Sequence, residues 1–369
     1  MEIHTLDAIS SVDGRYRHYI EELADYFSED ALILNRLKVE AEYFIFLSEH
    51  PKIKVRKFSD KEKGFVRWLY KQNKDHSFWV KNIETEKHCI KEINNGKPTN
   101  HDVKAVEYYM KYKLKDTSLE DCLEWIHFGL TSEDINNMAY GLMLSDSLEN
   151  IMIPKIETLQ EKIEKLAQEH KNVPMLARTH GQPASPTTLG KEFKVYSSRL
   201  ERQIQQLKKY HITVKFNGAT GNYNAHKIAY PKINWQAFSK KFINSFNKDR
   251  QIKLKPNLIT TQIEPHDTYA ELFDNMKRIN VILTDFNQDI WRYISDDWIT
   301  QKPVKGDVGS STMPHKVNPI DFENSEGNLG LANTLFEYFG RKLPISRLQR
   351  DLSDSTVERN FGLAFAHTL

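Results

Sequence analysis

The amino-acid sequence predicts an all-α protein built around a bundle of long helices. Glycine and proline are scarce, with 15 and 13 among 369 residues, below the roughly 12% that the two make up in average proteins. Turns are therefore few and regular elements long. Residues 266–302 contain neither, and apolar side chains recur there at spacings of three and four, which is typical of one face of a long helix. Strand signals are confined to short pieces such as 211–216.

Four segments supply the predicted bundle. The longest helix is expected over 267–295, and at 1.5 Å per residue it is about 40 Å long, so it needs partners along its whole length. Amphipathic patterns before Pro174 and after Pro186 predict two such partners, and 329–343 suggests another. The stripe on the longest helix consists of Tyr269, Leu272, Met276, Ile279, Leu283, Phe286, Ile290 and Tyr293.

The chain divides into two predicted domains. Residues 1–118 are more charged and are interrupted by glycine and proline, which predicts a smaller N-terminal helical domain. Residues 119–369 form the long-helix bundle. The sequence ends at Leu369 inside an apolar run that lacks a helix stop signal.

The overall composition argues against several functional classes. Lys and Arg number 52 against 50 Asp and Glu, so the one-signed charge of a nucleic-acid binder is missing. The two cysteines, Cys89 and Cys122, form neither a disulfide framework nor a CxxC zinc module, which favours a reducing compartment. The longest uncharged stretch, 179–190, is too short to span a membrane. The first residues lack a signal-peptide pattern, so we expect a cytoplasmic protein.

Sequence motifs for several chemistries are also missing. The sequence has no GxxxxGK[ST] phosphate loop, no GxGxxG after a strand and no HExxH. We therefore expect neither a cofactor nor a metal site.

The sequence GSSTMPHKVNP, residues 309–319, is the strongest candidate for chemistry. Its glycines and prolines prevent a regular helix, so we expect a loop that opens onto a helix near Pro319 or Ile320. The loop combines two hydroxyls, an ammonium, an amide and backbone N–H groups, which suit an anionic substrate or a developing oxyanion. The alternative is a solvated linker, but a linker does not require Met313, Pro314 and Asn318 in this order.

Further polar segments have both a structural and a functional interpretation. RTHGQPA, 178–184, forms a turn between two long helices, and its histidine can transfer a proton near neutral pH. NHDVKAVE, 100–107, and TSEDINN, 131–137, are each good helix-cap sequences, the latter with Ser132 as N-cap. TQIEPHD, 261–267, begins the longest helix. The segment 350–359 has arginines and hydroxyls suited to phosphate, or to a surface ion-pair cluster.

Together these motifs resemble a known family. GSSTMPHKVNP resembles the signature loop of the fumarase/aspartase superfamily, whose members break a C–N or C–O bond by β-elimination and release fumarate. The other motifs, from residue 11 to the last residues, resemble the bacterial adenylosuccinate lyase branch. The resemblance implies an all-α homotetramer in which three subunits build each active site. Members usually continue into a further C-terminal helical domain, which we expect to be missing from this chain.

The resemblance also implies an activity in purine biosynthesis and a set of site residues. The expected reaction converts adenylosuccinate to AMP and fumarate, and acts likewise on the succinylated aminoimidazole carboxamide ribotide. By resemblance, Ser310 is the general base, Lys316 helps to activate it, His180 is the general acid and His101 assists it. The expected substrate-binding residues are Arg15, Tyr16, Asn100, Asp102, Thr131, Ser132, Gln262, Ser311, Asn318, Asn324, Arg350, Ser355 and Arg359.

Two alternatives remain at this point. A sibling lyase acting on argininosuccinate, aspartate or malate would share the signature loop, although the phosphate-suited segment 350–359 argues against it. A non-catalytic helical scaffold would keep the fold alone, although Ser310, Lys316, Asn318 and His180 are retained. The expected partners are nucleotide-sized small molecules and further copies of the chain, with no nucleic acid and no membrane.

Overall fold

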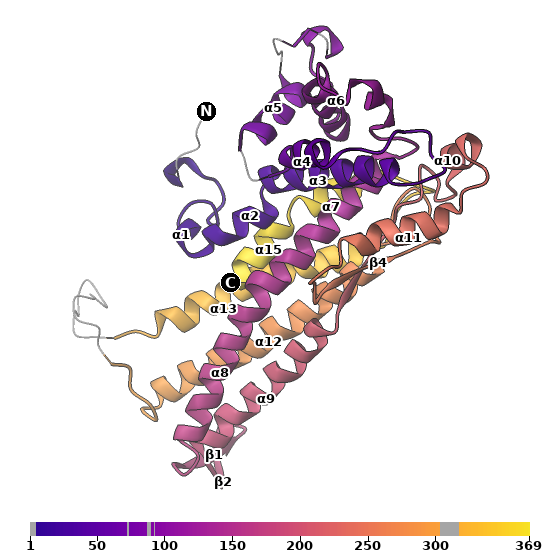
Figure 1. Cartoon of the computed structure of the whole chain (residues 1–369). Helices are drawn as coiled ribbons and strands as arrows, with labels where there is room; N and C mark the ends of the chain where they lie inside the picture. The colour runs from indigo at the N-terminus through magenta and orange to yellow at the C-terminus, as the bar shows by residue number, and fades with distance from the viewer. Residues whose placement is uncertain (1–4, 72–73, 87–89, 92, 303–316) are drawn as a thin grey trace.

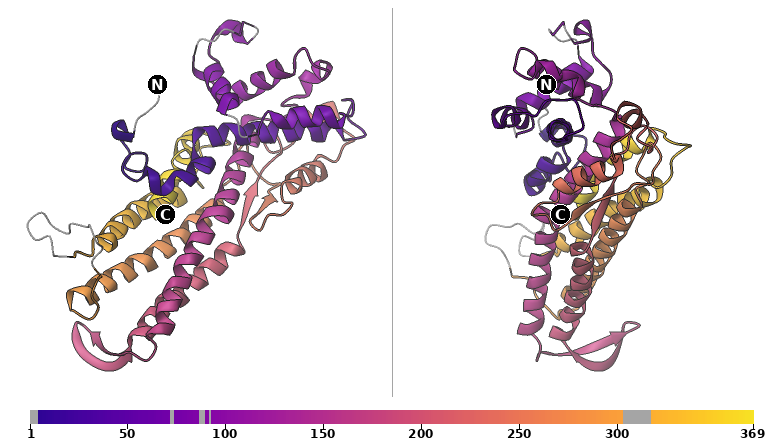
Figure 2. Two further views of the ribbon diagram at one scale, coloured as in Figure 1. Left: turned by 60° about the vertical axis from the view of Figure 1, so that its left-hand side comes forward. Right: turned by 45° about the vertical axis from the view of Figure 1, so that its right-hand side comes forward.

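The computed structural model describes residues 5–71, 74–86, 90–91, 93–302 and 317–369, and shows a rod of long helices with a group of shorter helices at one end (Figures 1 and 2). The predicted all-α class is confirmed, because only short strands interrupt the helices of the described part. None of the helices in these ranges has the length and apolar character needed to cross a membrane.

Five helices run along the rod (Figure 1). The helix α7 continues through a π-helical turn, Leu148–Met152, into α8, so that 132–169 is one nearly unbroken helical segment. The helices of the rod are α7 (Ser132–Ser147), α8 (Ile153–Glu169), α9 (Leu189–Lys208), α12 (Asp267–Ser295) and α13 (Ile320–Lys342). The bounds of α12 and the start of α13 are those that the sequence predicts. The pattern at 329–343 is the second half of α13 and not a separate helix.

The apolar stripe of α12 explains how the rod holds together. Tyr269, Leu272, Met276 and Ile279 are at most 1% exposed, whereas Leu283 is 8% exposed further along the helix. Each fully buried side chain of this size contributes about 1.5–3 kcal/mol relative to exposure. The stripe packs between α9 and α13, and polar bonds at its edge, such as Tyr196 Oη to Asp289, fix the helices relative to one another.

The remaining helices gather at one end of the rod and along its flank, and all of them except α3 are shorter than the helices of the rod. The helix α3 crosses the start of α7, and the hydrogen bond from Arg36 Nε to Asn136 Oδ1, 2.9 Å, ties the two together. The predicted domain boundary near residue 118 stays a prediction. The helices of this first part are α1 (Arg17–Ile20), α2 (Ala24–Phe27), α3 (Glu29–Ser48), α4 (Asp60–Trp68), α5 (Lys74–Thr85) and α6 (Asp102–Leu114). Those flanking the rod are α10 (Asn224–Ala229), α11 (Trp235–Ser245), α14 (Ser353–Glu358) and α15 (Phe361–Thr368).

The described strands form two small sheets. The predicted strand signal at 211–216 is confirmed as β3, His211–Val214, which pairs in parallel with β4, Lys253–Pro256. The antiparallel hairpin of β1, Pro174–Thr179, and β2, Gln182–Thr188, was not predicted from the sequence. Prolines argue against central strands because they cannot donate to a ladder, but both strands of an isolated hairpin are edge strands, where proline is tolerated.

Candidate active site

Most of the predicted site residues in the described part gather where the shorter helices meet the beginning of α7. We call this region the junction. His101 is the N-cap of α6, and its Nδ1 accepts a hydrogen bond from the Lys104 backbone N–H at 3.3 Å. Its Nε2 lies 3.4 Å from Ser132 Oγ. The side chain of His101 is 51% exposed, so the ring is anchored on one side and open to a ligand on the other.

The first turn of α7 holds the next group of predicted residues. Thr131, and not Ser132, is the N-cap of α7, because the Thr131 backbone N–H donates to the Asp134 carboxylate at 2.9 Å and places Ser132 inside the helix. Gln262, on the segment before α12, donates from Nε2 to Thr131 Oγ1 at 3.2 Å. Residues that lie far apart in the sequence therefore present hydroxyl and amide groups at one helix N-terminus, where an anion is favoured.

The two predicted phosphate-binding arginines also lie at the junction, and both bond to carboxylates. Arg350 Nη1 donates to Glu133 Oε2 at 2.7 Å, and Arg359 Nη2 donates to Asp102 Oδ2 at 2.9 Å. Arg359 also donates to Ser355 Oγ. The arginines belong to a partly buried ionic network and not to a solvated surface cluster.

Burial and charge shift the pKa values of the carboxylates in this network. Burial raises the pKa of Asp102, but the guanidinium of Arg36, 2.6 Å away, and that of Arg359 outweigh it, so the pKa is lowered overall. Burial raises the pKa of Glu133, and Arg350 only partly opposes it. Burial and the charge of Glu133 raise the pKa of Glu358 well above the ordinary value.

Two members of the junction, Arg36 and Glu133, were not predicted from the sequence. Arg36 is 1% exposed and Glu133 is 1% exposed, and each bonds directly to a predicted site residue or its neighbour. Arg36 lies inside α3 without a surrounding motif, so no local signal identifies it. Glu133 lies within TSEDINN, where an acidic residue in a first helical turn is explained by the helix dipole alone.

Tyr16 and Asn324 form a second group beside the junction. Tyr16 Oη donates to Asn324 Oδ1 at 3.0 Å, and both residues line a cavity of about 470 Å³. A neighbouring cavity of about 190 Å³ shares Val12 and Ala366 with it and reaches Arg359. The two cavities therefore connect the surroundings of Tyr16 with Arg359, while Arg15 is exposed beside Tyr16. Asn100 is exposed next to His101, with φ of 50°.

His180 lies at the opposite end of the rod. It forms, with Gly181, the two-residue loop of the β1–β2 hairpin, and φ values of 54° and 73° are those of a type I′ turn. His180 is exposed.

The hairpin leads into α9, whose start lies close to the end of α8. Gly190 allows this close approach, because a Cβ there would lie 2.3 Å from the Ala167 carbonyl oxygen.

The length of the rod separates His180 from His101. Ser132, next to His101, begins the helical segment that ends at Glu169, just before the hairpin. At 1.5 Å per residue this segment is on the order of 50 Å long, and Figure 1 shows the hairpin beyond its far end. One chain therefore does not bring its own His180 and His101 together.

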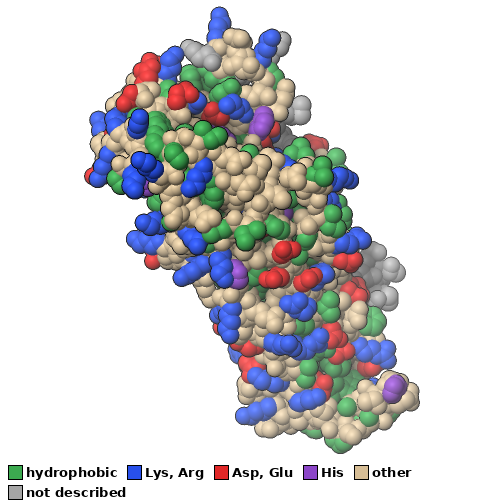
Figure 3. Space-filling model, turned by 90° about the vertical axis from the view of Figure 1, so that its right-hand side faces the viewer, with side chains coloured by type: hydrophobic (Ala, Val, Ile, Leu, Met, Phe, Trp, Pro, Cys, Tyr) green, Lys and Arg blue, Asp and Glu red, His purple; other side chains and the backbone are tan. Residues whose placement is uncertain are grey.

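The predicted loop residues are only partly described. Ser310, Ser311 and Lys316 lie outside the described residues. Asn318 is half-buried just before α13. On the face shown in Figure 3, Lys and Arg side chains alternate with Asp and Glu along the rod, in agreement with the nearly neutral composition.

Comparison with known proteins agrees with this architecture. Residues 72–332 match the family model described as lyase. The fold is similar to that of a fumarate lyase from Mesorhizobium sp. BNC1, with a TM-score of 0.69 at 16% identity over 94% of this chain and 72% of that one. It is equally similar to the 3-carboxy-cis,cis-muconate lactonizing enzyme of Pseudomonas putida, with a TM-score of 0.69 at 18% identity over 96% of this chain and 72% of that one. The fold and the family match define a lyase of the fumarase/aspartase type.

Sequence relatives narrow this class. The chain is 51% identical to the adenylosuccinate lyase of Dictyostelium discoideum, over all of this chain and 77% of that protein. It is 49% identical to that of Legionella pneumophila strain Corby and 45% identical to that of Escherichia coli K12, over all of this chain and 78% of each. The chain belongs to the adenylosuccinate lyase family.

Proposed function

We propose that this chain catalyses the β-elimination that splits adenylosuccinate into AMP and fumarate, and the matching step on the succinylated aminoimidazole carboxamide ribotide. The observation that carries the proposal is the junction, where His101, Thr131, Gln262, Arg350 and Arg359 converge around one helix N-terminus. A substrate that bears both a phosphate and two carboxylates needs such a combination of arginines, hydroxyls and amide groups.

The reaction needs three functions from the protein. A base removes a proton from the carbon beside one carboxylate, the electron pair forms the double bond of fumarate, and the C–N bond breaks. An acid then protonates the departing nitrogen. Positive or N–H groups stabilise the carboxylate that gathers charge in the transition state.

We assign these functions to the residues that the sequence predicts. Ser310 is the base, with Lys316 lowering the energy of its alkoxide, and His180 is the acid. His101 orients the substrate or the proton donor. Thr131, Ser132 and Asn318 hold the succinyl carboxylates, while Tyr16, Gln262 and the two arginines Arg350 and Arg359 hold the nucleotide.

The geometry supports an active site shared between copies of the chain. His180 is separated from the junction by a helical segment on the order of 50 Å long, so the acid and the substrate-binding groups must come from different copies. The rod also leaves apolar side chains exposed on α12 and α13, among them Val281 at 53% and Leu331 at 54%, which a partner helix would cover. We propose a homo-oligomer, and a tetramer as its form.

Complementation between two inactive variants tests both parts of this proposal. His101→Ala and His180→Ala are purified separately, mixed, unfolded gently and reassembled, and fumarate and AMP are followed by chromatography. We expect each variant alone to be nearly inactive with adenylosuccinate and the mixture to regain activity, because hybrid sites can combine intact residues from two copies. No recovery in a mixed oligomer would contradict the shared site. Turnover of argininosuccinate in place of adenylosuccinate would contradict the substrate.

A further inference from the structure

We infer that Lys215, a fully buried lysine outside the proposed site, is a positioning residue that fixes Thr131 and Gln262 through an ion pair with Asp134. This inference deepens the proposed function and rests on it, because the two fixed residues are proposed to bind the substrate. Lys215 and Asp134 are each 0% exposed, so neither side chain meets a ligand.

The ammonium of Lys215 joins three separate segments of the chain. Its Nζ lies 2.9 Å from Asp134 Oδ1 and donates at 2.9 Å to each of the backbone carbonyl oxygens of Gly218 and Gln262. An ammonium has three N–H donors, and all three are used. The Lys215 backbone is held as well, because its N–H donates to Asn137 Oδ1 at 2.7 Å and its carbonyl accepts from Asn137 Nδ2 at 3.1 Å.

The carboxylate of Asp134 extends this hydrogen-bond network to the proposed substrate-binding residues. Its oxygens accept from the backbone N–H groups of Thr131 at 2.9 Å, Asn217 at 2.9 Å and Gly218 at 3.1 Å. Thr131 Oγ1 in turn accepts from Gln262 Nε2. One buried pair therefore fixes the backbone of Thr131 on one side and the backbone of Gln262 on the other.

The energetics favour a positioning role over a purely stabilising one. A fully buried ion pair carries a large desolvation penalty, and replacing both charges by neutral groups of similar size is often neutral or stabilising. The bond to the Gln262 carbonyl oxygen satisfies the third ammonium donor, and it also ties the segment before α12 to the start of α7. This connection matters for geometry because a shift of about 1 Å at a binding group can lower activity by about 10²-fold.

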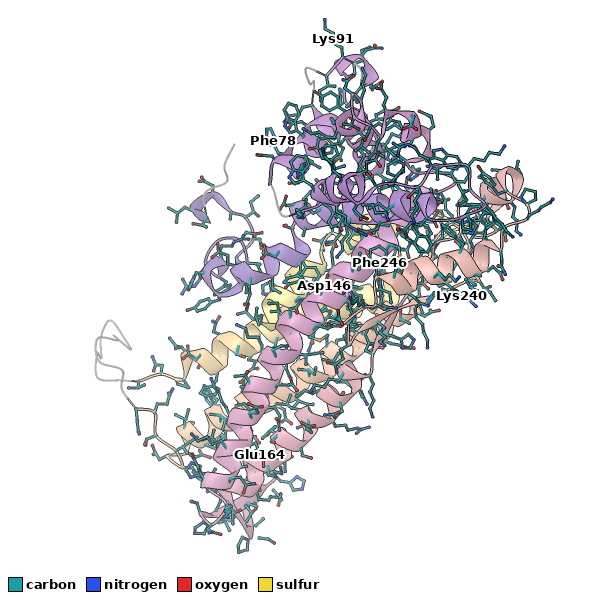
Figure 4. The ribbon with its side chains drawn as sticks, viewed as in Figure 1. Phe78, Lys91, Asp146, Glu164, Lys240 and Phe246 are labelled. Carbon is teal, nitrogen blue, oxygen red and sulfur yellow. The ribbon has the colours of Figure 1, made fainter. Side chains whose placement is uncertain are left out.

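The test compares the fully buried Lys215 with a second ion-paired cation that is largely shielded from solvent. Lys215→Met keeps an unbranched side chain of nearly the same length and removes its donors. Arg250→Met is the matched control, because Arg250 is 11% exposed and pairs at 2.5 Å with Asp146, halfway along the rod and away from the junction (Figure 4). A double variant, Lys215→Met with Asp134→Asn, removes both buried charges and guards against failure of the single variant to fold.

Two readouts are measured well below the unfolding temperature of each protein. For adenylosuccinate we expect KM to rise about tenfold or more in both Lys215 variants, with a smaller change in kcat, because binding groups are displaced. KM stays unchanged in Arg250→Met. Amide hydrogen exchange at Thr131, Asn217 and Gly218 accelerates in the Lys215 variants only, and this readout needs no substrate.

The outcomes separate the inference from the proposed function. Unchanged KM and unchanged exchange in the folded Lys215 variants would overturn the positioning role, and so would an equal rise in KM for Arg250→Met. If both Lys215 variants fail to fold while Arg250→Met folds, the pair is a folding requirement and the inference is wrong. No fumarate from the unchanged chain would overturn the proposed function, while the exchange data would still decide whether Lys215 fixes Thr131.

Discussion

The junction and the hairpin hold their functional residues in opposite ways. At the junction, buried ion pairs and caps from α3, α6, α7 and the segment before α12 fix each side chain, as Arg36 does for Asp102. At the hairpin, His180 lies on an exposed two-residue turn, and the bonds that shape it are local, such as that from Arg178 Nη1 to the Gly181 carbonyl. This difference teaches that one chain brings the arginines, hydroxyls and amide groups of the junction together, whereas it leaves its own His180 exposed at the opposite end of the rod.

The largest effect that can test this comparison comes from removing His180, the proposed acid. We expect His180→Ala to lower kcat about 10²–10⁴-fold, the range typical of general acid–base residues. We expect the thermal midpoint to stay the same, because the side chain is exposed. Steady-state kinetics and thermal unfolding check both parts. A kcat within twofold of the unchanged protein would remove His180 from the mechanism.

The next largest effect concerns stability at the junction. Arg36→Met removes the buried partner of Asn136 and leaves Asp102 with Arg359 as its remaining cation, and we expect the unfolding free energy to fall by about 3 kcal/mol, the lower end of the range for a broken buried pair. The matched control is Arg199→Met on the rod, where Arg199 and Asp285 are 38% and 49% exposed. That pair contributes less than about 1 kcal/mol. Urea unfolding compares the two, and equal losses would mean that the junction is no more dependent on its ion pairs than the rod.

A smaller effect is the pH dependence of the junction. Burial lowers the pKa of His127, but the charge and hydrogen bond of Glu40, with Glu107 and Asp134 nearby, outweigh it and raise the pKa above 6.5. The stabilisation from the protonated ring is therefore complete below pH 6.5 and is lost as the pH rises through the folded value.

A variant without the His127–Glu40 pair tests whether this stabilisation is lost as the pH rises. Relative to the double variant Glu40→Gln with His127→Gln, the unchanged chain is expected to be more stable at pH 6 than at alkaline pH by about 1.5–3 kcal/mol, the size of a hydrogen bond to a charged group. The difference in stability between the two proteins therefore shrinks at alkaline pH. Urea unfolding at several pH values measures it, and a difference that grows with pH would show that the ring is neutral in the folded protein.

The sequence predicts the rod better than it predicts the junction, for a physical reason. The stripe of α12 repeats every three and four residues, so its period alone locates the helix from Asp267 to Ser295. Arg36 and Lys215 carry no such period, because their partners come from distant segments. The prolines of β1 and β2 concealed the hairpin, although His180 next to Gly181 is a possible type I′ signal.

In the candidate site, too, some residues could be predicted from the sequence while their partners could not. The motifs identify Thr131, Gln262, Arg350 and Arg359, and the structure brings these residues together. The carboxylates that hold the arginines could not be assigned from the sequence, since a motif shows which residue types occur but not which cation each acid meets. The placement of His180 at the far end of the rod follows only from the three-dimensional arrangement.

The smallest expected effect on stability tests whether the hairpin is shaped for its histidine. Gly181 has φ of 73°, and no atom lies within 4 Å of a Cβ built there. Gly181→Ala therefore introduces backbone strain of about 1–2 kcal/mol without a clash. Because the hairpin is exposed, it can relieve this strain by local rearrangement, and we expect the thermal midpoint to change little while kcat falls several-fold as His180 moves. Gly64→Ala, within the exposed part of α4 and also free of neighbours, is the control. If kcat is unchanged in Gly181→Ala, the acid does not depend on the shape of its own turn, and contacts with another copy must position it.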